Sequence, residues 1–385
     1  MEDLCPPCPV FWRFWLPAGK LVVIVRGKYA EVTTMENQEK KHKRRVRYSG
    51  AYPKSYKEKY KELNPEKYAD TVSRVIQKGS TPAGMHISIC VSEILEFLQI
   101  KPGQTGLDAT LGYGGHTQEM LKCLDSRGHL YALDVDPIES AKTKERLEKL
   151  GFGEDILSIR LQNFADIDRV SEEAGLFDFV LADLGVSSMQ IDNPDRGFSY
   201  KTEGPLDLRM NPEKGISAAE RLRNITQEEL QGMLLENADE PYAGEISREA
   251  VTRLKRSKTI DTTGDLRQVI EDALAFLPAA ERREAVKKSC QRTFQALRID
   301  VNNEFEALYS FMEKLPGVLA PNGRVAILTF HSGEDRIVKK SFKQFYKEGL
   351  YREISNEVIR PSAEECSRNS RARSTKMRWA IRAED

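Results

Sequence analysis

A glycine-rich turn at residues 108–116, Asp-Ala-Thr-Leu-Gly-Tyr-Gly-Gly-His, has the composition of a ligand-binding loop. It follows an apolar run and precedes an amphipathic one, a pattern that predicts a strand, a turn and the start of a helix. Such a turn brings backbone N–H groups close to a ligand. Gly112, Gly114 and Gly115 do not match the Gly-x-Gly-x-x-Gly fingerprint of dinucleotide sites. With Asp108 at the strand end, the loop suits a cofactor with a carboxylate and an ammonium group, such as S-adenosylmethionine; an ordinary tight turn is the alternative.

A second acidic site follows a short apolar strand predicted over residues 129–134. A carboxylate about 20 residues after a glycine loop is placed to accept hydrogen bonds from ribose hydroxyls. The competing reading makes an aspartate the N-cap of a helix that begins near Pro137. Both roles fit together if Asp136 caps the helix and Asp134 binds the cofactor. Because NAD enzymes use the same device, this site favours a nucleoside cofactor more firmly than a methyl donor.

Composition limits the remaining possibilities. The 385 residues suffice for two domains, or for one large domain with an insertion. The formal net charge is zero, so any surface that attracts nucleic acid must be local. Six scattered cysteines argue for a reducing, cytoplasmic compartment, and Cys5 and Cys8 lack the second pair that a zinc site needs. No stretch approaches the ~18 apolar residues of a membrane span.

The N-terminal region differs from the rest of the chain. Residues 1–34 are apolar and aromatic but broken by charge, and Met35 opens an ordinary hydrophilic start, so we expect 1–34 to be disordered or not translated. Residues 35–84 form a basic arm, whose densest part is the cationic run 40–47. Tyrosines follow that run at positions 48, 52, 56 and 60. Cations with interleaved aromatics suit RNA phosphates and exposed bases; a solvated arm is an equally good interpretation.

Strands and helices alternate from residue 87 onward. The expected strands are 105–109, 129–134, 156–161, 177–183 and 324–330. Alternation predicts an α/β fold with a parallel sheet, whose ligands lie at the carboxyl ends of the strands. The glycine loop, Asp134 and Asp183 all fall at that edge. The expected division is a core over 85–214 and 295–350, a helical insertion over 215–294, and a tail with a final core strand over 351–385.

The insertion is helical in period and rich in charge. Thr226 and Glu229 form a capping box. One apolar stripe at helical spacing, expected to be core, comprises Leu266, Val269, Ile270, Ala273, Leu274 and Leu277. The cations of the segment are Arg253, Lys255, Arg256, Lys258, Arg282, Arg283, Lys287, Lys288 and Arg292. They predict either a phosphate-binding face or an ordinary solvated one.

The fourth predicted strand leads to residues that could take part in a reaction. It ends at Asp183 and continues into a short polar loop that contains Gln190. Amino-methyltransferases place such a loop against an exocyclic amine, a poor nucleophile because its lone pair is delocalised into the ring. Acceptors for the N–H protons favour the geometry needed for attack. This chemistry needs no metal, and the sequence has no His/Cys cluster with ligand spacing.

Longer motifs then point to a family. They are Gly-Gly-His at 114–116, Asp-Leu-Gly-Val-Ser-Ser at 183–188, Arg-Gly-Phe-Ser at 196–199, Thr-Phe-Gln-Ala-Leu-Arg-Ile at 293–299, Phe-His-Ser-Gly-Glu-Asp-Arg at 330–336 and Asn-Ser-Arg-Ala-Arg-Ser at 369–374. Over residues 86–382 the sequence resembles the 16S rRNA (cytosine(1402)-N(4))-methyltransferase family, known as RsmH or MraW. The resemblance implies a Rossmann-like class I core dependent on S-adenosylmethionine, and 16S rRNA of the small ribosomal subunit as partner.

The resemblance also implies the site residues. The cofactor contacts carry over to Gly114, Gly115, His116, Asp134, Phe164, Asp183 and Gln190. Asp183 is also the candidate catalytic acceptor, with cofactor binding alone as the competing role. A homodimer is an additional expectation.

Departures from the family pattern leave other readings open. Ser88, Leu208, Asn211 and Gly333 replace family residues, and the basic arm is extra, which leaves open a paralogue with the same chemistry on a different cytosine. A NAD-dependent oxidoreductase would need a pyrophosphate-type glycine loop and a proton relay. A non-catalytic RNA-binding protein would not need Asp183 beside a cofactor loop.

Overall fold

The computed structural model describes residues 13–15, 21–25, 28–31 and 88–384, in two units that divide at Tyr52 and Pro53. In the first unit β1 (Arg13–Trp15), β2 (Leu21–Val25) and β3 (Lys28–Glu31) pair as a three-stranded antiparallel sheet. The basic arm predicted over 35–84 lies outside the described residues. A translation start at Met35 and disorder of 1–34 stay predictions.

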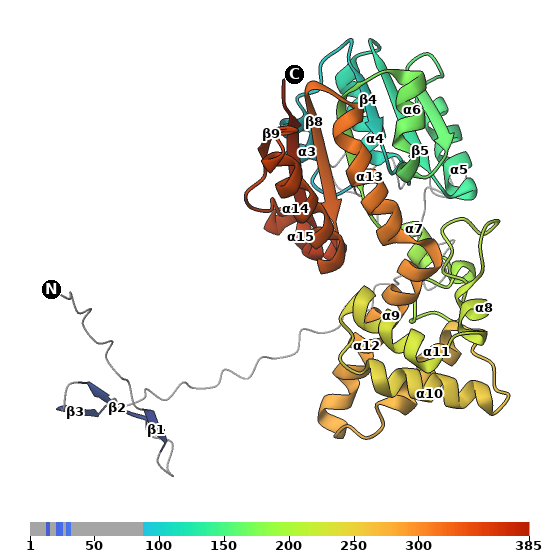
Figure 1. Cartoon of the computed structure of the whole chain (residues 1–385), viewed down its shortest axis with the longest axis vertical. Helices are drawn as coiled ribbons and strands as arrows, with labels where there is room; N and C mark the ends of the chain where they lie inside the picture. The colour runs from blue at the N-terminus through green and yellow to red at the C-terminus, as the bar shows by residue number, and fades with distance from the viewer. Residues whose placement is uncertain (1–12, 16–20, 26–27, 32–87, 385) are drawn as a thin grey trace, which may run out of the picture. The chain divides into compact units, whose positions relative to one another are not determined.

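A seven-stranded sheet forms the centre of the second unit (Figure 1), in the order β6-β5-β4-β7-β8-β10-β9. The strands are β4 (Thr105–Asp108), β5 (His129–Asp134), β6 (Leu157–Leu161), β7 (Phe177–Asp183), β8 (Leu319–Thr329), β9 (Tyr351–Ile354) and β10 (Lys376–Arg382). The strands β6, β5, β4, β7 and β8 run parallel, whereas β10 is antiparallel to both neighbours. The order reverses at β4, as in doubly wound folds. The α/β, Rossmann-like class I methyltransferase fold predicted from the sequence is confirmed.

Helices cover both faces of this sheet because alternate residues of each strand point to opposite sides. The covering helices are α3 (Val91–Leu98), α4 (Gly115–Leu124), α5 (Pro137–Lys149), α6 (Ile167–Ala174), α13 (Glu304–Val318) and α14 (Ser332–Lys347). In β7, Val180 packs into one apolar cluster with α6, α13 and α14. Its neighbour Leu181 packs into another with α3, α4 and α5. The two clusters hold the carboxyl ends of the strands rigidly at one edge.

The helical insertion has its own core. Its helices are α8 (Ala218–Arg223), α9 (Gln227–Ala238), α10 (Ala243–Lys255), α11 (Thr263–Ala273) and α12 (Ala279–Asn302). The capping box of Thr226 and Glu229 is confirmed at α9. Four residues of the predicted stripe are buried in this core, and Ala273 and Leu277 pack against it. Helix α12 continues past the boundary predicted at 294, so one helix belongs to both the insertion and the core.

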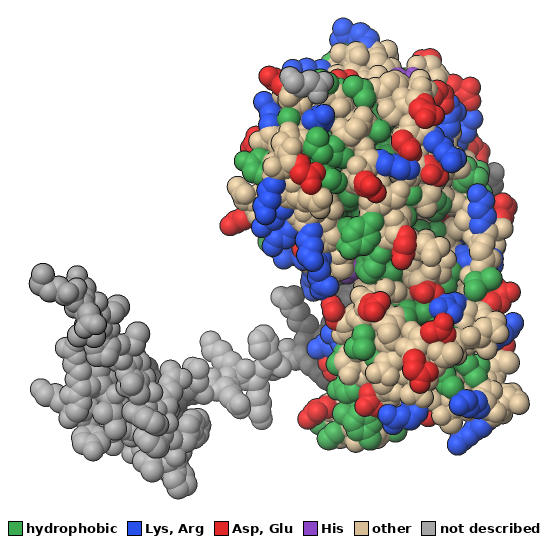
Figure 2. Space-filling view, viewed as in Figure 1, with side chains coloured by type: hydrophobic (Ala, Val, Ile, Leu, Met, Phe, Trp, Pro, Cys, Tyr) green, Lys and Arg blue, Asp and Glu red, His purple; other side chains and the backbone are tan. Residues whose placement is uncertain are grey.

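Two properties of the surface agree with the composition. Cationic and acidic side chains are interspersed over the visible face of the second unit (Figure 2), as a net charge of zero requires. Among the described residues no helix is both long and apolar enough to cross a membrane.

Candidate functional site

A cavity of about 350 Å³ lies at the carboxyl ends of β4, β5, β7 and β8. Every residue predicted to contact the cofactor lines it: Gly114, Gly115, His116, Asp134, Phe164, Asp183 and Gln190. The opposite wall comes from α12, α13, the start of α14 and residues 369–374. The volume is within the range of small-molecule sites, and the position is the switch point where the strand order reverses.

The glycine loop is shaped by close backbone approach. Gly114 is the N-cap of α4 at a φ of 71°, a left-handed conformation that favours glycine. A Cβ on Gly115 would lie 2.0 Å from the Ser88 hydroxyl oxygen. Helix α5 supports the loop from behind, because the Thr143 hydroxyl donates to the carbonyl of Gly112 at 2.6 Å. Gly114 and Gly115 therefore bring the backbone at the start of α4 to the cavity wall without a side chain of their own.

Asp108, which ends the strand before the glycine loop, has a structural role. Its side chain is 1% exposed and does not line the cavity. The carboxylate accepts hydrogen bonds from the Thr117 hydroxyl at 2.6 Å and from the Thr110 N–H at 3.1 Å. It therefore holds the loop together from the inside.

Asp136 has the capping role considered for it, whereas cofactor binding by Asp134 stays a prediction. Asp136 caps α5, accepting from the N–H groups of Ile138 and Glu139, so that prediction is confirmed. Asp134 accepts from the N–H groups of Gly112 and Asp136, both at 2.8 Å, and also borders the cavity. Burial raises its pKa to about 6, although these two N–H groups oppose the shift. Its carboxylate is thus held in one orientation with lone pairs toward the cavity.

Gln190 is held by a buried polar network. Its amide N–H donates to Asp136 at 2.7 Å, and its carbonyl oxygen accepts from the Ser187 N–H at 2.8 Å. Asp136 also receives the Arg196 guanidinium at 2.7 Å, and Arg196 donates onward to the carbonyl of Met210. Phe164, the other predicted contact, packs edge-on against a phenylalanine of α13, with ring centroids 5.3 Å apart. Both side chains have a single fixed position beside the cavity.

Asp183 has the least satisfied side chain of the site. Its Oδ1 is buried with no hydrogen-bond partner among the described residues, whereas Oδ2 lies 3.5 Å from Nδ1 of His116. Nε2 of His116 lies 2.9 Å from the Ile89 carbonyl, which only accepts, so Nε2 donates there and Nδ1 is the ring nitrogen that faces the carboxylate. Burial raises the pKa of Asp183 to about 6, with His116 opposing the shift. The Asp183 carboxylate can therefore accept an N–H hydrogen bond or a proton near neutral pH.

An ionic cluster on the opposite wall was missed by the sequence analysis. Arg298 of α12 makes two hydrogen bonds to Glu304, at 2.7 and 2.8 Å. Glu334 accepts from the Phe330 N–H at 2.8 Å and lies 3.1 Å from Nε2 of His331. Burial alone would raise the pKa of Glu334, but His331, Arg298 and this N–H hold it below its usual value. The motifs at 293–299 and 330–336 contain Arg298, His331 and Glu334 but not Glu304, and spacing alone assigned none of them a role.

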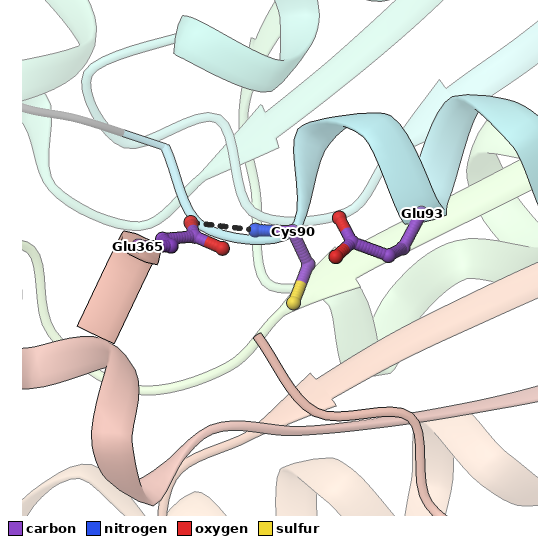
Figure 3. Close-up of side chains that lie close together, drawn as sticks. All are labelled: Cys90, Glu93 and Glu365. Carbon is purple, nitrogen blue, oxygen red and sulfur yellow. Dashed lines mark hydrogen bonds between the residues drawn. The ribbon is translucent and has the colours of Figure 1, made fainter. Parts of the chain in front are cut away.

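Two side-chain groups have the composition of metal ligands. Glu304, His331 and Glu334 form one, but the Arg298 guanidinium already supplies the positive charge there. Cys90, Glu93 and Glu365 form the other (Figure 3). There Glu365 accepts from the Cys90 N–H at 3.0 Å and thereby caps α3, while burial raises the pKa of the Cys90 thiol. A protonated thiol is a poor ligand, so neither group carries a metal proposal. The absence of a metal stays a prediction.

Comparison with known proteins identifies the family. The model of the MraW methylase family matches residues 83–383. The chain belongs to the MraW methylase family. It is accordingly an S-adenosylmethionine-dependent methyltransferase, and the resemblance drawn from the motifs is confirmed.

Several named relatives accompany this match. "Ribosomal RNA small subunit methyltransferase H 1" of Lachnoclostridium phytofermentans is 74% identical over 348 residues, covering 90% of this chain and 95% of the relative. "Ribosomal RNA small subunit methyltransferase H" of Koribacter versatilis is 40% identical over 301 residues, covering 77% and 94%. Among solved structures, a SAM-dependent O-methyltransferase from Thermotoga maritima is 11% identical at a TM-score of 0.36, covering 82% of this chain and 71% of that one.

The match to the 74% identical relative extends beyond the region that matches the MraW methylase family model. That 348-residue match exceeds the 301 residues of 83–383 by 47, and only two residues follow position 383. The shared sequence therefore extends by some 40 residues or more to the N-terminal side of residue 83. The basic arm, extra to the family pattern, is at least partly shared with the H 1 relative.

Proposed function

We propose that this methyltransferase methylates the exocyclic N4 amine of a cytosine in 16S rRNA of the small ribosomal subunit, cytosine 1402 near the decoding centre. The observation that carries the proposal is the buried, unpartnered Oδ1 of Asp183 at the cavity wall. It is an acceptor beside a cofactor cradle, as an amine nucleophile requires. The names of the relatives, rRNA small subunit methyltransferases, support the class of substrate.

The cradle fits S-adenosylmethionine, which when bound supplies an electrophilic methyl group. The N–H groups at the start of α4 suit the donor's carboxylate. Asp134, fixed by two backbone N–H groups, has acceptor capacity left for ribose hydroxyls. Phe164 and Leu133 provide apolar surface in the same cavity for the adenine ring. His116 and Gln190 complete the wall between this cradle and the loop that follows β7.

Asp183 has a chemical task at the boundary of the cradle. Oδ1 accepts one N–H of the cytosine amine, so that the nitrogen lone pair is directed toward the methyl group. The amine nitrogen becomes cationic as it gains a substituent and must then release a proton. The Asp183 carboxylate can take it, because its pKa of about 6 leaves it unprotonated at neutral pH yet close to the range where it accepts a proton. The base must leave its stack to reach this position, so the substrate cytosine is single-stranded or flipped.

A methyl-transfer assay tests the proposal. The protein is incubated with small subunits or naked 16S rRNA and isotopically labelled S-adenosylmethionine, and N4-methylcytosine is mapped in the product. Label at another RNA cytosine would assign the chain to a paralogous amino-methyltransferase. RNA binding without transfer of label would leave a non-catalytic RNA-binding protein.

Asp134→Ala is expected to weaken cofactor binding by about 1.5–3 kcal/mol, because a charge-assisted acceptor is lost. Binding of the cofactor to the wild type should also weaken as the pH falls through about 6, because the Asp134 carboxylate, whose pKa is raised to about 6, becomes protonated there. Isothermal titration with S-adenosylmethionine measures both effects, with circular dichroism as the control for folding. Unchanged affinity in a folded variant would remove Asp134 from the ribose site.

Deletion of residues 1–50 is expected to weaken RNA binding and to lower its dependence on salt, because the run 40–47 contributes phosphate contacts. Affinity for the cofactor should not change. Titrating labelled RNA at several salt concentrations measures the effect. A salt dependence equal to that of the full chain would make the arm a bystander.

Two further expectations belong to the proposal. A cytoplasmic location agrees with a ribosomal RNA substrate, and imaging of the tagged protein would test it. The homodimer stays a prediction, which sedimentation of the full chain would test. Neither affects the assignment of the reaction.

A further inference from the structure

The outer face of α14 has a charge pattern that sequence analysis did not single out. Between Arg336 and Lys347 the helix carries five cations and no acidic residue, in a chain whose net charge is zero. Arg336, Lys340, Lys343 and Lys347 are spaced by four, three and four residues, with Lys339 beside them, so they share one face of the helix. All five are exposed, while Ile337, Val338 and Phe342 on the opposite face are buried.

Four of these five cations have no acidic partner among the described residues. Arg336 approaches Asp239 at 3.7 Å, but Lys339, Lys340, Lys343 and Lys347 form no ion pair within the part of the chain that the structure describes. Several other lysines of the core do form ion pairs: Lys122 with Glu119, Lys144 with Glu148 and Glu154, and Lys149 with Glu145. Figure 2 shows blue side chains gathered on the flank of the core where Figure 1 places α14.

Helix stability does not account for the pattern. Cations in the last turn interact favourably with the helix dipole, which explains Lys347 and in part Lys343. Arg336 with Lys340, Lys339 with Lys343, and Lys343 with Lys347 are like charges four residues apart, an arrangement that destabilises a helix. A polyanionic partner would convert this repulsion into attraction.

The position of the face connects it to the cavity. His331, the N-cap of α14, and Glu334 in its first turn both line the cavity. Lys339 is therefore about 12 Å from the cavity wall along the axis, and the stripe from Arg336 to Lys347 is about 16 Å long. That length accommodates roughly three to five successive phosphates at the axial spacing of a nucleic-acid strand. The exposed ring of Tyr346 lies in the same stretch and can stack on a base.

We propose that this cationic face of α14 binds the phosphate backbone of the RNA strand that leads to the cavity. The proposal rests on the proposed function, since it assigns the surface to that reaction's own substrate. Because phosphate contacts carry no sequence information, α14 supplies affinity and register, and the cavity selects the base.

The triple variant Lys339→Gln/Lys340→Gln/Lys343→Gln tests it in the full chain. Binding to a labelled single-stranded 16S rRNA fragment is titrated at several salt concentrations. Loss of three phosphate contacts should lower the slope of log affinity against log salt by about 2 and weaken binding on the order of 10- to 100-fold near 0.1 M salt. KM for RNA should rise, while kcat at saturating RNA and the affinity for S-adenosylmethionine should not change. The matched control is Lys122→Gln/Lys144→Gln/Lys149→Gln, which removes the same charge from paired lysines.

Each other outcome has a defined meaning. A slope equal to that of the wild type, or equal losses in the test and control variants, would overturn the assignment of α14. Weaker binding to assembled small subunits with unchanged binding to naked RNA would assign the face to a ribosomal protein, and this too overturns it. If the wild-type protein transfers no methyl group to rRNA, the proposed function fails, whereas the RNA titration still decides whether α14 binds phosphates.

Discussion

Asp183→Asn is expected to lower the rate of methyl transfer at saturating cofactor by about 100-fold or more, on the order of 3 kcal/mol. The substitution keeps the size of the side chain but removes its charge and one acceptor, so the cytosine amine loses its alignment and its proton acceptor. Single-turnover assays on small subunits measure the effect. The wild-type rate should itself fall as the pH drops through about 6, because the Asp183 carboxylate, whose pKa is raised to about 6, becomes protonated there.

The same variant separates catalysis from cofactor binding. Near-normal turnover at saturating cofactor would mean that Asp183 only helps to hold the cofactor and that the catalytic acceptor lies elsewhere in the loop. The free energy of unfolding supplies a control, because the substitution should lower activity without lowering stability at pH 7. The folded pKa is above the unfolded one, so the wild-type protein loses stability as the pH rises from about 4 to 6. The Asn variant escapes this loss and should be as stable as the wild type at pH 7, or more stable by about 1–2 kcal/mol.

Arg298→Met is expected to lower the free energy of unfolding by about 3–5 kcal/mol at pH 7. Arg298 compensates Glu304 by two hydrogen bonds and also lowers the pKa of buried Glu334, so its removal leaves Glu304 without its cation and Glu334 with His331 as its remaining partner. Denaturation in urea measures the loss. The loss should diminish toward pH 5, because the uncompensated carboxylates then take up protons.

A surface pair provides the comparison for Arg298. Arg267 contacts Glu271 at 2.7 Å on the surface, where the Arg267 side chain is exposed and that of Glu271 is half-buried. Arg267→Met should therefore cost under about 1 kcal/mol. If both variants lose the same free energy of unfolding, the ionic cluster of the cavity wall contributes no more to stability than an ordinary surface ion pair.

Much of the parallel core could be predicted because its strands are short apolar runs with clear ends. β5 and β7 have the predicted bounds, and β4 and β6 differ from them by one residue. β8 begins at Leu319, five residues before the predicted start. The prediction began too late because Pro321 to Gly323 has the composition of a turn. β9, Tyr-Arg-Glu-Ile, was missed because four residues with two charges give no periodic signal.

The candidate site could be predicted on one wall only. Gly114, Asp134 and Asp183 follow strands, and parallel strands bring their carboxyl ends to one edge regardless of the details of packing. Arg298 and Glu334 reach the cavity because the insertion returns α12 to the core, a long-range arrangement that no local pattern encodes. The orientation of Asp108 could not be predicted either. Its carboxylate points into the interior because it accepts a hydrogen bond from the Thr117 hydroxyl of α4.

The continuity of α12 makes the insertion inseparable from the catalytic core. Its first half packs in the insertion through Cys290 and Phe294, while Arg298 and Asn302, one and two turns further on, form the cavity wall. Asn302 also fastens the loop before the insertion, donating to the Leu208 carbonyl and accepting from the Met210 N–H. Excising residues 215–294 would thus remove the first part of α12 and leave the cavity wall formed by its last turns without support. The insertion and the core therefore form a single structural unit around the cavity, although they are separate stretches of sequence.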